Sequence, residues 1–201
     1  AGQSFPGNAA TFNHVTVSNT SANLTANAAT TINGNLTTAA SSNINMVTFQ
    51  LLGTVNGTAN SGTVQTQCTA NPAIPNGATW GGQVTYNSTT TAMFVASGTY
   101  NNLTITGTSG ARTTTGAITV NGNMAVGTAA TTSGITTLGG NLIVAGNLSI
   151  GSSVTANVFD VSGSNYQITL GGNWSQSSSA ATNPFNRRNG LVVINGTGTQ
   201  T

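Results

Sequence analysis

Short apolar strands separated by one recurring small turn constrain the fold of this chain most strongly. Three segments share the order apolar, small, Gly, Asn, apolar, and they follow one another after 24 and 26 residues: Val120–Met124, Val144–Leu148 and Leu170–Trp174. A fourth copy stands at Ile32–Leu36. A fixed period of roughly 20 to 50 residues indicates units that cannot bury their apolar face alone and bury it by stacking. The chain therefore has the signature of a repeat architecture.

The residues between these turns alternate between apolar and small polar side chains. Leu103 and Ile105 share one face of a short segment, as do Ile118 and Val120, with Thr between the members of each pair. This period of two is typical of strands, whereas the abundant Gly, Thr and Asn are poor helix formers. We expect an all-β chain in which about 24 residues form each turn of a β-solenoid.

A longer internal repeat relates the two halves of the chain. Phe12–Leu36 aligns without a gap with Tyr100–Met124, at a constant offset of 88 residues that keeps the apolar strand positions apolar and preserves Asn-Gly-Asn. We interpret the chain as two related solenoid modules, residues 1–83 and 84–201, in one continuous solenoid.

Two segments rich in Pro, Gly or Ser break this rhythm. Residues 56–82 contain Pro72 and Pro75, and residues 175–190 contain Pro184. Proline is confined to the edges and turns of sheets because it cannot donate a ladder hydrogen bond. We predict that both segments project from the solenoid as loops.

Charged side chains are nearly absent, which excludes several functions. They make up 2% of the 201 residues, with no Lys and no Glu, and the net charge of +2 comes from Arg112, Arg187 and Arg188 against Asp160. Two adjacent arginines cannot form the clustered basic surface that binds nucleic acid. The longest apolar runs, such as Leu191–Ile194, fall far short of the ~20 residues of a membrane helix. We expect neither a nucleic-acid partner nor a membrane span.

The side chains that carry enzyme chemistry are too few for a catalytic site. Asp160 is the one side-chain carboxylate, so a pair of carboxylates acting as acid and base is excluded. His14 has no partner acid and is expected to be a polar strand or turn residue. The repeat turns carry Asn where calcium sites need Asp, and the lone Cys68 fits no internal disulfide, zinc or redox spacing. We expect no enzyme activity, no cofactor and no metal.

The recurring Asn and the two Trp residues have separate expected roles. Asn123, Asn147 and Asn173 are expected to stack as a ladder in which each amide bonds the backbone or the next turn of the coil. Trp174 stands at an apolar position of the repeat and is expected in the core. Trp80 lies in the first predicted loop and is the candidate contact for a partner or a glycan.

The last residues repeat an interior pattern without its continuation. Gly190–Thr201 has the form of Gly82–Thr91, and in the interior a strand at Tyr100–Ile105 follows within about ten residues. Open ends of a solenoid expose unpaired backbone groups and an apolar interior. We therefore predict head-to-tail contacts with other copies, or with flanking repeats of a longer chain. The candidate residues for these contacts are Phe12, Val15, Val17, Val192 and Ile194.

The chain resembles the tandem repeats of very large bacterial surface and secreted proteins, the adhesin and haemagglutinin-like β-solenoids, in the strings "YNNLTITG", "AITVNGNMAV", "NLIVAGNLSIG", "YQITLGGNW" and "LVVINGTGTQT". The resemblance covers most of the chain apart from the two predicted loops and rests on strand and turn patterns. It implies a right-handed parallel β-helix or a related solenoid, an extracellular or cell-surface location in a bacterium, and an adhesive or scaffolding role.

Two departures and two alternatives accompany this resemblance. The chain carries less charge than a typical adhesin and is short, so it is either a segment of a giant protein or the subunit of a filament. The alternatives are an ice-binding solenoid with a flat array of outward Thr, and a carbohydrate-binding module centred on Trp80 with surface glycans as partners.

Overall fold

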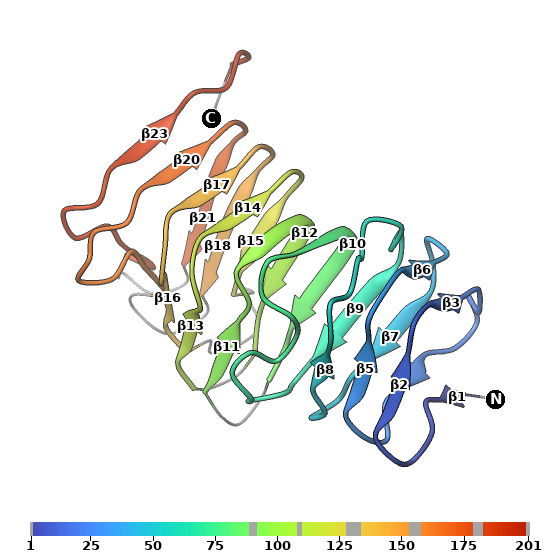
Figure 1. The fold of residues 1–201 in the computed structure, drawn as a ribbon. Coiled ribbons are helices and arrows are strands. Elements are labelled where there is room, and N and C mark those ends of the chain that lie inside the picture. Colours follow the sequence, from blue (N-terminus) through green and yellow to red (C-terminus); the bar gives the residue numbers. More distant parts are fainter. Residues whose placement is uncertain are drawn as a thin grey trace.

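Alternation between apolar and small polar residues produces short strands that pair in parallel. The computed structural model describes residues 2–88, 92–107, 110–127, 134–152, 158–178 and 183–199, and in these ranges it contains 23 strands and no helix. The apolar side chains point into one continuous core, and small polar residues alternate with them on the outside. The predicted all-β solenoid is confirmed, and Figure 1 shows its strands stacked in order from the N-terminal to the C-terminal end.

Each turn of the coil lays strands on three faces, which we name faces 1, 2 and 3 in chain order, and we call the strands of one turn a level. The first level consists of β1 (Gln3–Ser4), β2 (Ala10–Phe12) and β3 (Val15–Val17). The second consists of β4 (Leu24–Thr25), β5 (Thr30–Ile32) and β6 (Leu36–Thr38). Because β4 pairs with β1, β5 with β2 and β6 with β3, each face is a parallel sheet.

Face 1 is an unbroken ladder from the first level to the last. After β1 and β4 it contains β7 (Asn43–Asn45), β9 (Thr63–Thr66), β10 (Ala78–Tyr86), β12 (Gly98–Ile105), β15 (Met124–Val126), β18 (Leu148–Ser152) and β21 (Trp174–Ser178). Strands β10 and β12 begin on face 3 and end on face 1, with a register shift between Trp80 and Gln83. This bend joins the two faces into one 13-stranded sheet.

Faces 2 and 3 are built in the same way from shorter strands. On face 2, β2, β5 and β8 (Leu51–Leu52) form a three-stranded sheet. A separate five-stranded sheet follows, with β11 (Met93–Val95), β13 (Arg112–Thr114), β16 (Thr136–Thr137), β19 (Phe159–Asp160) and β22 (Phe185–Asn186). On face 3, bridges through Asn56–Asn60 link β6 to β10, and the ladder ends with β14 (Ile118–Val120), β17 (Leu142–Val144), β20 (Ile168–Leu170) and β23 (Val192–Ile194).

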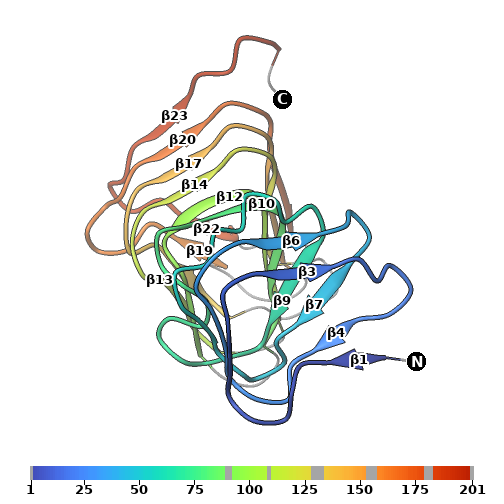
Figure 2. The ribbon, with the colours of Figure 1, turned by 45° about the vertical axis from the view of Figure 1, so that its right-hand side comes forward.

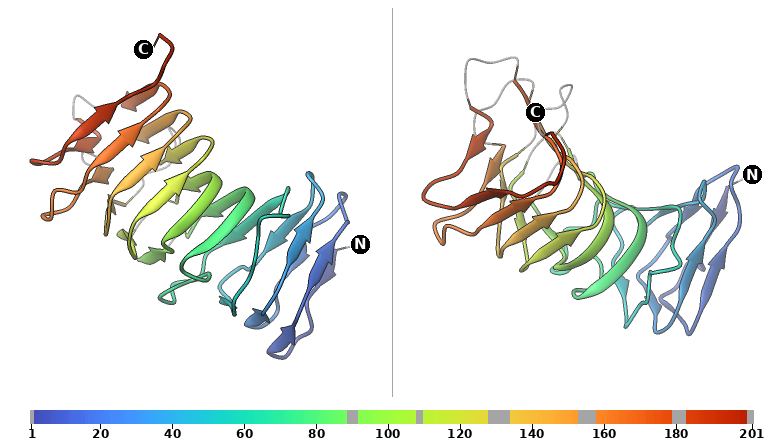
Figure 3. Two further views of the ribbon diagram at one scale, coloured as in Figure 1. Left: turned by 45° about the horizontal axis from the view of Figure 1, so that its top comes forward. Right: turned by 90° about the horizontal axis from the view of Figure 1, so that it is seen from above.

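Nine levels, and hence eight steps, make up the coil along face 1. Paired residues lie 19 to 21 positions apart over the first six steps, and 24 and 26 apart over the last two. The mean is about 21 residues, so the expected period of 24 describes the last two steps and overestimates the first six. At ~4.8 Å per step the rod is about 40 Å long. The further views in Figure 3 show the strands keeping their order along this stack.

The apolar residues of the repeat turns stack on one another inside the coil. We call such a set, in which each residue pairs with its equivalent on the next level, a file. Val120 pairs with Val144, and Val144 pairs with Leu170, and all three side chains are buried. The predicted stacking of successive chain segments is confirmed for these residues. Each level therefore buries its apolar face on its neighbours, which is the main stabilising contact of a solenoid.

The 88-residue repeat relates corners of the coil rather than whole turns. Ile32–Leu36 spans the corner between faces 2 and 3, whereas its aligned partner Val120–Met124 spans the corner between faces 3 and 1. The two halves are thus offset by four levels and one face. All three faces consist of strands joined at tight corners, so the same strand-turn-strand sequence fits at more than one corner.

Residues 56–82 belong to the coil, in contrast to the predicted loop. They contain β9 and the start of β10, and the side chains of Cys68, Ile74 and Trp80 are buried. Pro72 and Pro75 lie between these two strands, where no strand ladder requires their N–H. Because β10 also crosses the expected boundary between residues 83 and 84, the two modules form one ladder.

The second predicted loop, residues 175–190, is also partly strand. It contains most of β21 and all of β22, which pairs with β19 on face 2. Residues 179–182 lie outside the described residues.

Candidate functional site: the two ends of the coil

A ladder of asparagine side chains holds the corner between faces 3 and 1. The Oδ1 atom of Asn102 accepts the backbone N–H of Asn123 at 2.8 Å. Asn123 Oδ1 accepts the N–H of Asn147 at 2.9 Å, and Asn147 Oδ1 accepts that of Asn173 at 2.8 Å. The predicted Asn ladder is confirmed, and it satisfies backbone donors that the corner leaves without a strand partner.

The glycine of the repeat turn is required by the close approach of adjacent levels. A Cβ atom added to Gly146 would lie 2.7 Å from Asn123 Oδ1, and one added to Gly172 would lie 2.7 Å from Asn147 Oδ1. In both places the same atom would also collide with a backbone carbonyl of the preceding level. The Gly-Asn pair of the motif therefore encodes a contact between levels.

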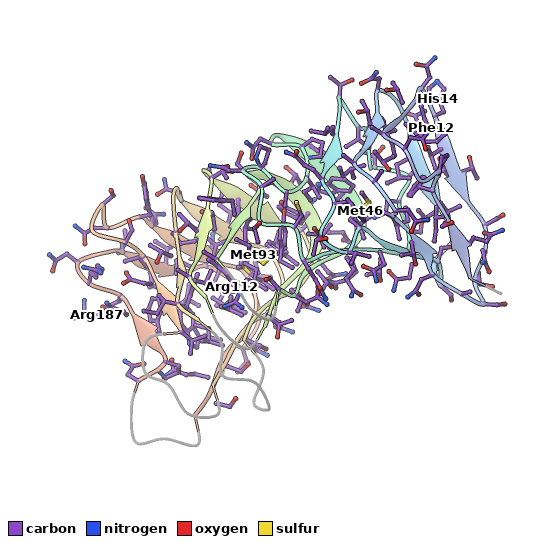
Figure 4. All side chains as sticks on the ribbon, turned by 90° about the horizontal axis from the view of Figure 1, so that it is seen from below. Phe12, His14, Met46, Met93, Arg112 and Arg187 are labelled. Atoms are coloured by element: carbon purple, nitrogen blue, oxygen red, sulfur yellow. The ribbon has the colours of Figure 1, made fainter. Side chains whose placement is uncertain are left out.

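His14 has the role of an asparagine at the corner between faces 2 and 3. Its imidazole Nδ1 accepts the backbone N–H of Asn35 at 3.0 Å, and its side chain is exposed. Figure 4 shows His14 near the N-terminal end and Arg187 near the C-terminal end, both pointing outward, while Met46, Met93 and Arg112 lie inside. The expectation of a polar turn residue at His14 agrees with this placement.

The C-terminal end of the coil exposes the interior file of face 3. Tyr100, Val120, Val144 and Leu170 are each 0% exposed, and the next member of the same file, Ile194, is 55% exposed. Ile194 points along the same direction as its buried predecessors, so its exposure arises because no further level covers it. An apolar position of the core is thus open to solvent at this end.

An aromatic cluster extends this open surface across faces 1 and 2. The rings of Trp174 and Phe185 meet edge to face at 4.8 Å between centroids, and Phe185 lies 5.8 Å from Phe159. Trp174 follows the buried Leu148 in the inward file of face 1 but is itself only partly buried. The expectation that Trp174 fills a core position agrees with its file, and its incomplete burial reflects its place in the last level.

The N-terminal end has a matching aromatic pair and a cleft. Phe5 and Phe12 lie 6.0 Å apart and close the first level, with Phe12 half-buried. Between faces 3 and 1 at this end is a cleft of about 580 Å³, lined by Gln3, Ser4, Thr16, Val17, Ser18, Asn19 and Leu24. Figure 2 shows β1, β3 and β4 beside one another at this end.

All five predicted end residues lie in the first or last level. Phe12 is in β2, Val15 and Val17 are in β3, and Val192 and Ile194 are in β23. The other strands of the two end levels were not predicted as end strands from the sequence: β1, β21 and β22, with Phe5, Trp174 and Phe185. Gln3 precedes Leu24 by 21 residues and pairs with it. Because this spacing equals one turn of the coil, it is the sequence signal from which β1 could have been located.

The ion pair near the C-terminal end leaves little charge there. Arg188 donates to Asp160 from Nε at 2.7 Å and from Nη2 at 2.8 Å. Asp160 also accepts the N–H of Ser162 and a hydrogen bond from Asn186. The bonds from Arg188 lower the pKa of the Asp160 carboxyl below its ordinary value, despite an opposing effect of burial.

Arg112 lies inside the coil, at an inward position of β13. Its side chain is 0% exposed, and its guanidinium donates to the carbonyl oxygens of Ser88, Gly110 and Gly134 at 3.1 to 3.2 Å. Burial lowers its pKa from the ordinary value. The 88-residue offset aligns Arg112 with Leu24, so this position is an exception to the apolar alignment expected for the repeat.

Trp80 does not have the surface position that a glycan contact needs. It is 1% exposed and belongs to the interior file of face 3, between Gly57 and Tyr100. A Cβ on Gly57 would lie 2.7 Å from the Trp80 ring, so the indole occupies the space of the missing side chain. The assignment of Trp80 to a projecting loop led to the wrong surface role.

The outward side of face 3 carries a file of β-branched residues. It runs through β10, β12, β14, β17, β20 and β23 as Thr79, Thr99, Thr119, Ile143, Thr169 and Val193. Two positions further along these strands the residues are Gly, Asn or Ala, so this file has no second Thr file beside it. Ice binding by a paired Thr array stays a prediction without support from this face.

Comparisons and remaining chemistry add no further site. Within the described ranges, no three His, Cys, Asp or Glu side chains gather where they could hold a metal ion, and no helix has the length and hydrophobicity to cross a membrane. No known protein family, curated protein or solved structure gives a match to this chain. The two open ends are therefore the surfaces from which a function is argued.

Proposed function

We propose that this chain is a rod segment of a bacterial extracellular or surface filament, with a structural or adhesive role, and that it extends by stacking further levels on its two ends. The observation that carries the proposal is the exposure of Ile194 in a file whose preceding members are fully buried. The stacked levels belong either to other copies or to flanking repeats of a longer chain, since both would use the same strand edges.

Physical chemistry favours such stacking at both ends. The outermost strands present unpaired N–H and C=O groups, which act as a template for another parallel strand. Soluble proteins usually protect such edges with charged residues, yet β1, β2, β3 and β23 contain none. A head-to-tail contact that repeats without closing produces a filament.

Electron microscopy and sedimentation of the purified chain test this proposal. We expect fibres whose axial repeat is nine levels of ~4.8 Å, about 43 Å. Dispersed monomers at high concentration would contradict the proposal. Labelling of intact cells with an antibody tests the surface location separately.

A matched pair of variants separates the ends from the sides of the rod. Ile194→Lys places a charge on the open interior file and is expected to shift the material from fibres to monomers. Ile143→Lys is the control, because Ile143 is similarly exposed, at 47%, but faces outward from the middle of the ladder on face 3. Equal loss of fibres in both variants would show that the assembly uses the sides.

A further inference from the structure

The first and last levels present their open edges on the same three faces and in the same order. In the described ladders, β1, β2 and β3 pair with the second level, and β21, β22 and β23 pair with the eighth. All of these pairs are parallel, so a second copy can add its first level to the last level of another without reversing any strand. A coil with three faces still allows three rotations of one copy on the next.

Two features at one corner distinguish these rotations. The N-terminal cleft lies between faces 3 and 1, with walls from β1, β3 and β4. At the opposite end, Asn195–Thr199 follow β23 at the corner that leads from face 3 to face 1. The backbone N–H of Asn195 donates to the carbonyl of Leu170, and the N–H of Gly171 donates to the carbonyl of Val144 in the same way one level earlier. The chain after β23 therefore begins the same corner as the chain after β20. Figure 1 shows this segment beside the corners that follow β14, β17 and β20.

The cleft and this segment meet in one rotation only. If face 1 of one copy continues face 1 of the next, Asn195–Thr199 of the first copy lie at the cleft of the second. In the other two rotations the segment would lie against a corner that the second copy's own chain already fills. These corners are the tight turn at Asn13–His14, between β2 and β3, and the loop between β1 and β2.

Building on the head-to-tail function proposed above, we propose that copies join with face 1 on face 1: β1 of one copy pairs in parallel with β21 of another, and Asn195–Thr199 fill the N-terminal cleft. The outward file of face 1 then continues across the joint. Within one chain this file passes through Ser149 and Ser175, whose Oγ atoms are 2.9 Å apart. Ser4, the outward residue of β1, is the next member.

Disulfide trapping tests this rotation. Neighbouring residues of parallel strands lie ~4.8 Å apart, within the Cα separation that a disulfide spans. Ser4→Cys with Ser175→Cys is expected to give covalent dimers and higher multiples on mild oxidation, because the two positions of one chain are separated by eight steps. Ser149→Cys with Ser175→Cys is the control, because these two residues are neighbours on adjacent strands of one chain and should form a disulfide within that chain. Cys68→Ser removes the buried native thiol from all variants.

Two further pairs report the other rotations. Ser4→Cys combined with Asn186→Cys bridges copies if β1 lies on β22, and combined with Val193→Cys if β1 lies on β23. We expect both pairs, and Ser4→Cys alone, to stay mainly monomeric on a denaturing non-reducing gel. Fibres whose bridges form in one of these pairs would overturn the rotation and leave head-to-tail assembly standing. Monomers in the microscope with no bridge in any pair would overturn both proposals.

Discussion

A pair of buried tyrosines should make this rod sensitive to alkali. Tyr86 and Tyr100 are 0% exposed, and their hydroxyl oxygens are 3.4 Å apart. Tyr100 donates to the carbonyl of Ala96 at 2.6 Å, and Tyr86 accepts the N–H of Ala96 at 3.0 Å. The proton of Tyr86 is therefore directed to Tyr100, and the three groups form a closed set of hydrogen bonds.

Burial sets the direction and size of the effect. It raises the pKa of Tyr86 from 10.0 to about 12, and it raises the pKa of Tyr100 well above 10.0. Above pH 10 the unfolded chain releases phenol protons that the folded chain retains, so stability is complete below pH 10 and falls as pH rises through the folded pKa. At ~1.4 kcal/mol per pKa unit, the raised pKa of Tyr86 alone removes about 3 kcal/mol once the pH exceeds the folded pKa, most of it between pH 10 and 12, and Tyr100 adds to this loss. Domains are stable by only about 5 to 15 kcal/mol.

Urea denaturation at a series of pH values from 8 to 12 measures this loss, with tyrosinate absorbance recorded on the folded chain in parallel. We expect two of the three tyrosines to ionise only as the circular dichroism of the folded state is lost. Tyr86→Phe should flatten the fall in stability. Reversible ionisation of all three tyrosines near pH 10 with unchanged circular dichroism would refute the reasoning.

Three further substitutions test the contacts between levels, and a fourth tests the ion pair of Asp160 with Arg188. Leu148→Ala removes a fully buried side chain and should lower the free energy of unfolding by about 3 to 5 kcal/mol in urea denaturation. Gly146→Ala should cost about 1 to 3 kcal/mol because its Cβ meets the preceding level, while Ala145→Gly, on the exposed neighbour, should cost less than 1 kcal/mol; equal costs would contradict the steric account. Because Arg188 lowers the pKa of Asp160, that carboxylate contributes stability above pH ~4 that is lost as pH falls through its lower native pKa. Asp160→Asn should remove this loss of stability at acid pH in urea denaturation. If the free energy of unfolding of the variant still falls with pH, another group causes the loss.

Much of the architecture could be predicted from local patterns. The period of two identified strands such as Ile118–Val120, and the spacing of the Gly-Asn turns placed Val120, Val144 and Leu170 in one file. The same turns predicted the hydrogen bonds of Asn123, Asn147 and Asn173, because identical residues repeated at one level spacing must meet.

Other features depend on contacts that local patterns do not define. Proline and glycine around Trp80 indicated a loop, but the side chain fills the space beside Gly57 on the preceding level. Arg112 is held inside by backbone carbonyls from three levels, and carbonyls carry no sequence signal. The end strands β1 and β21 are short or of unremarkable sequence, and their importance follows from the order of the levels.

The interchangeability of corners has a consequence for how such rods grow by gene duplication. A copied stretch of 88 residues lengthens the coil by four levels and one face, so everything beyond the insertion is turned by one third of a revolution about the long axis. Groups carried on the flanks would then change the direction in which they point, while the interior stays filled. Variation in segment length could thus set the angular arrangement of whatever the rod displays.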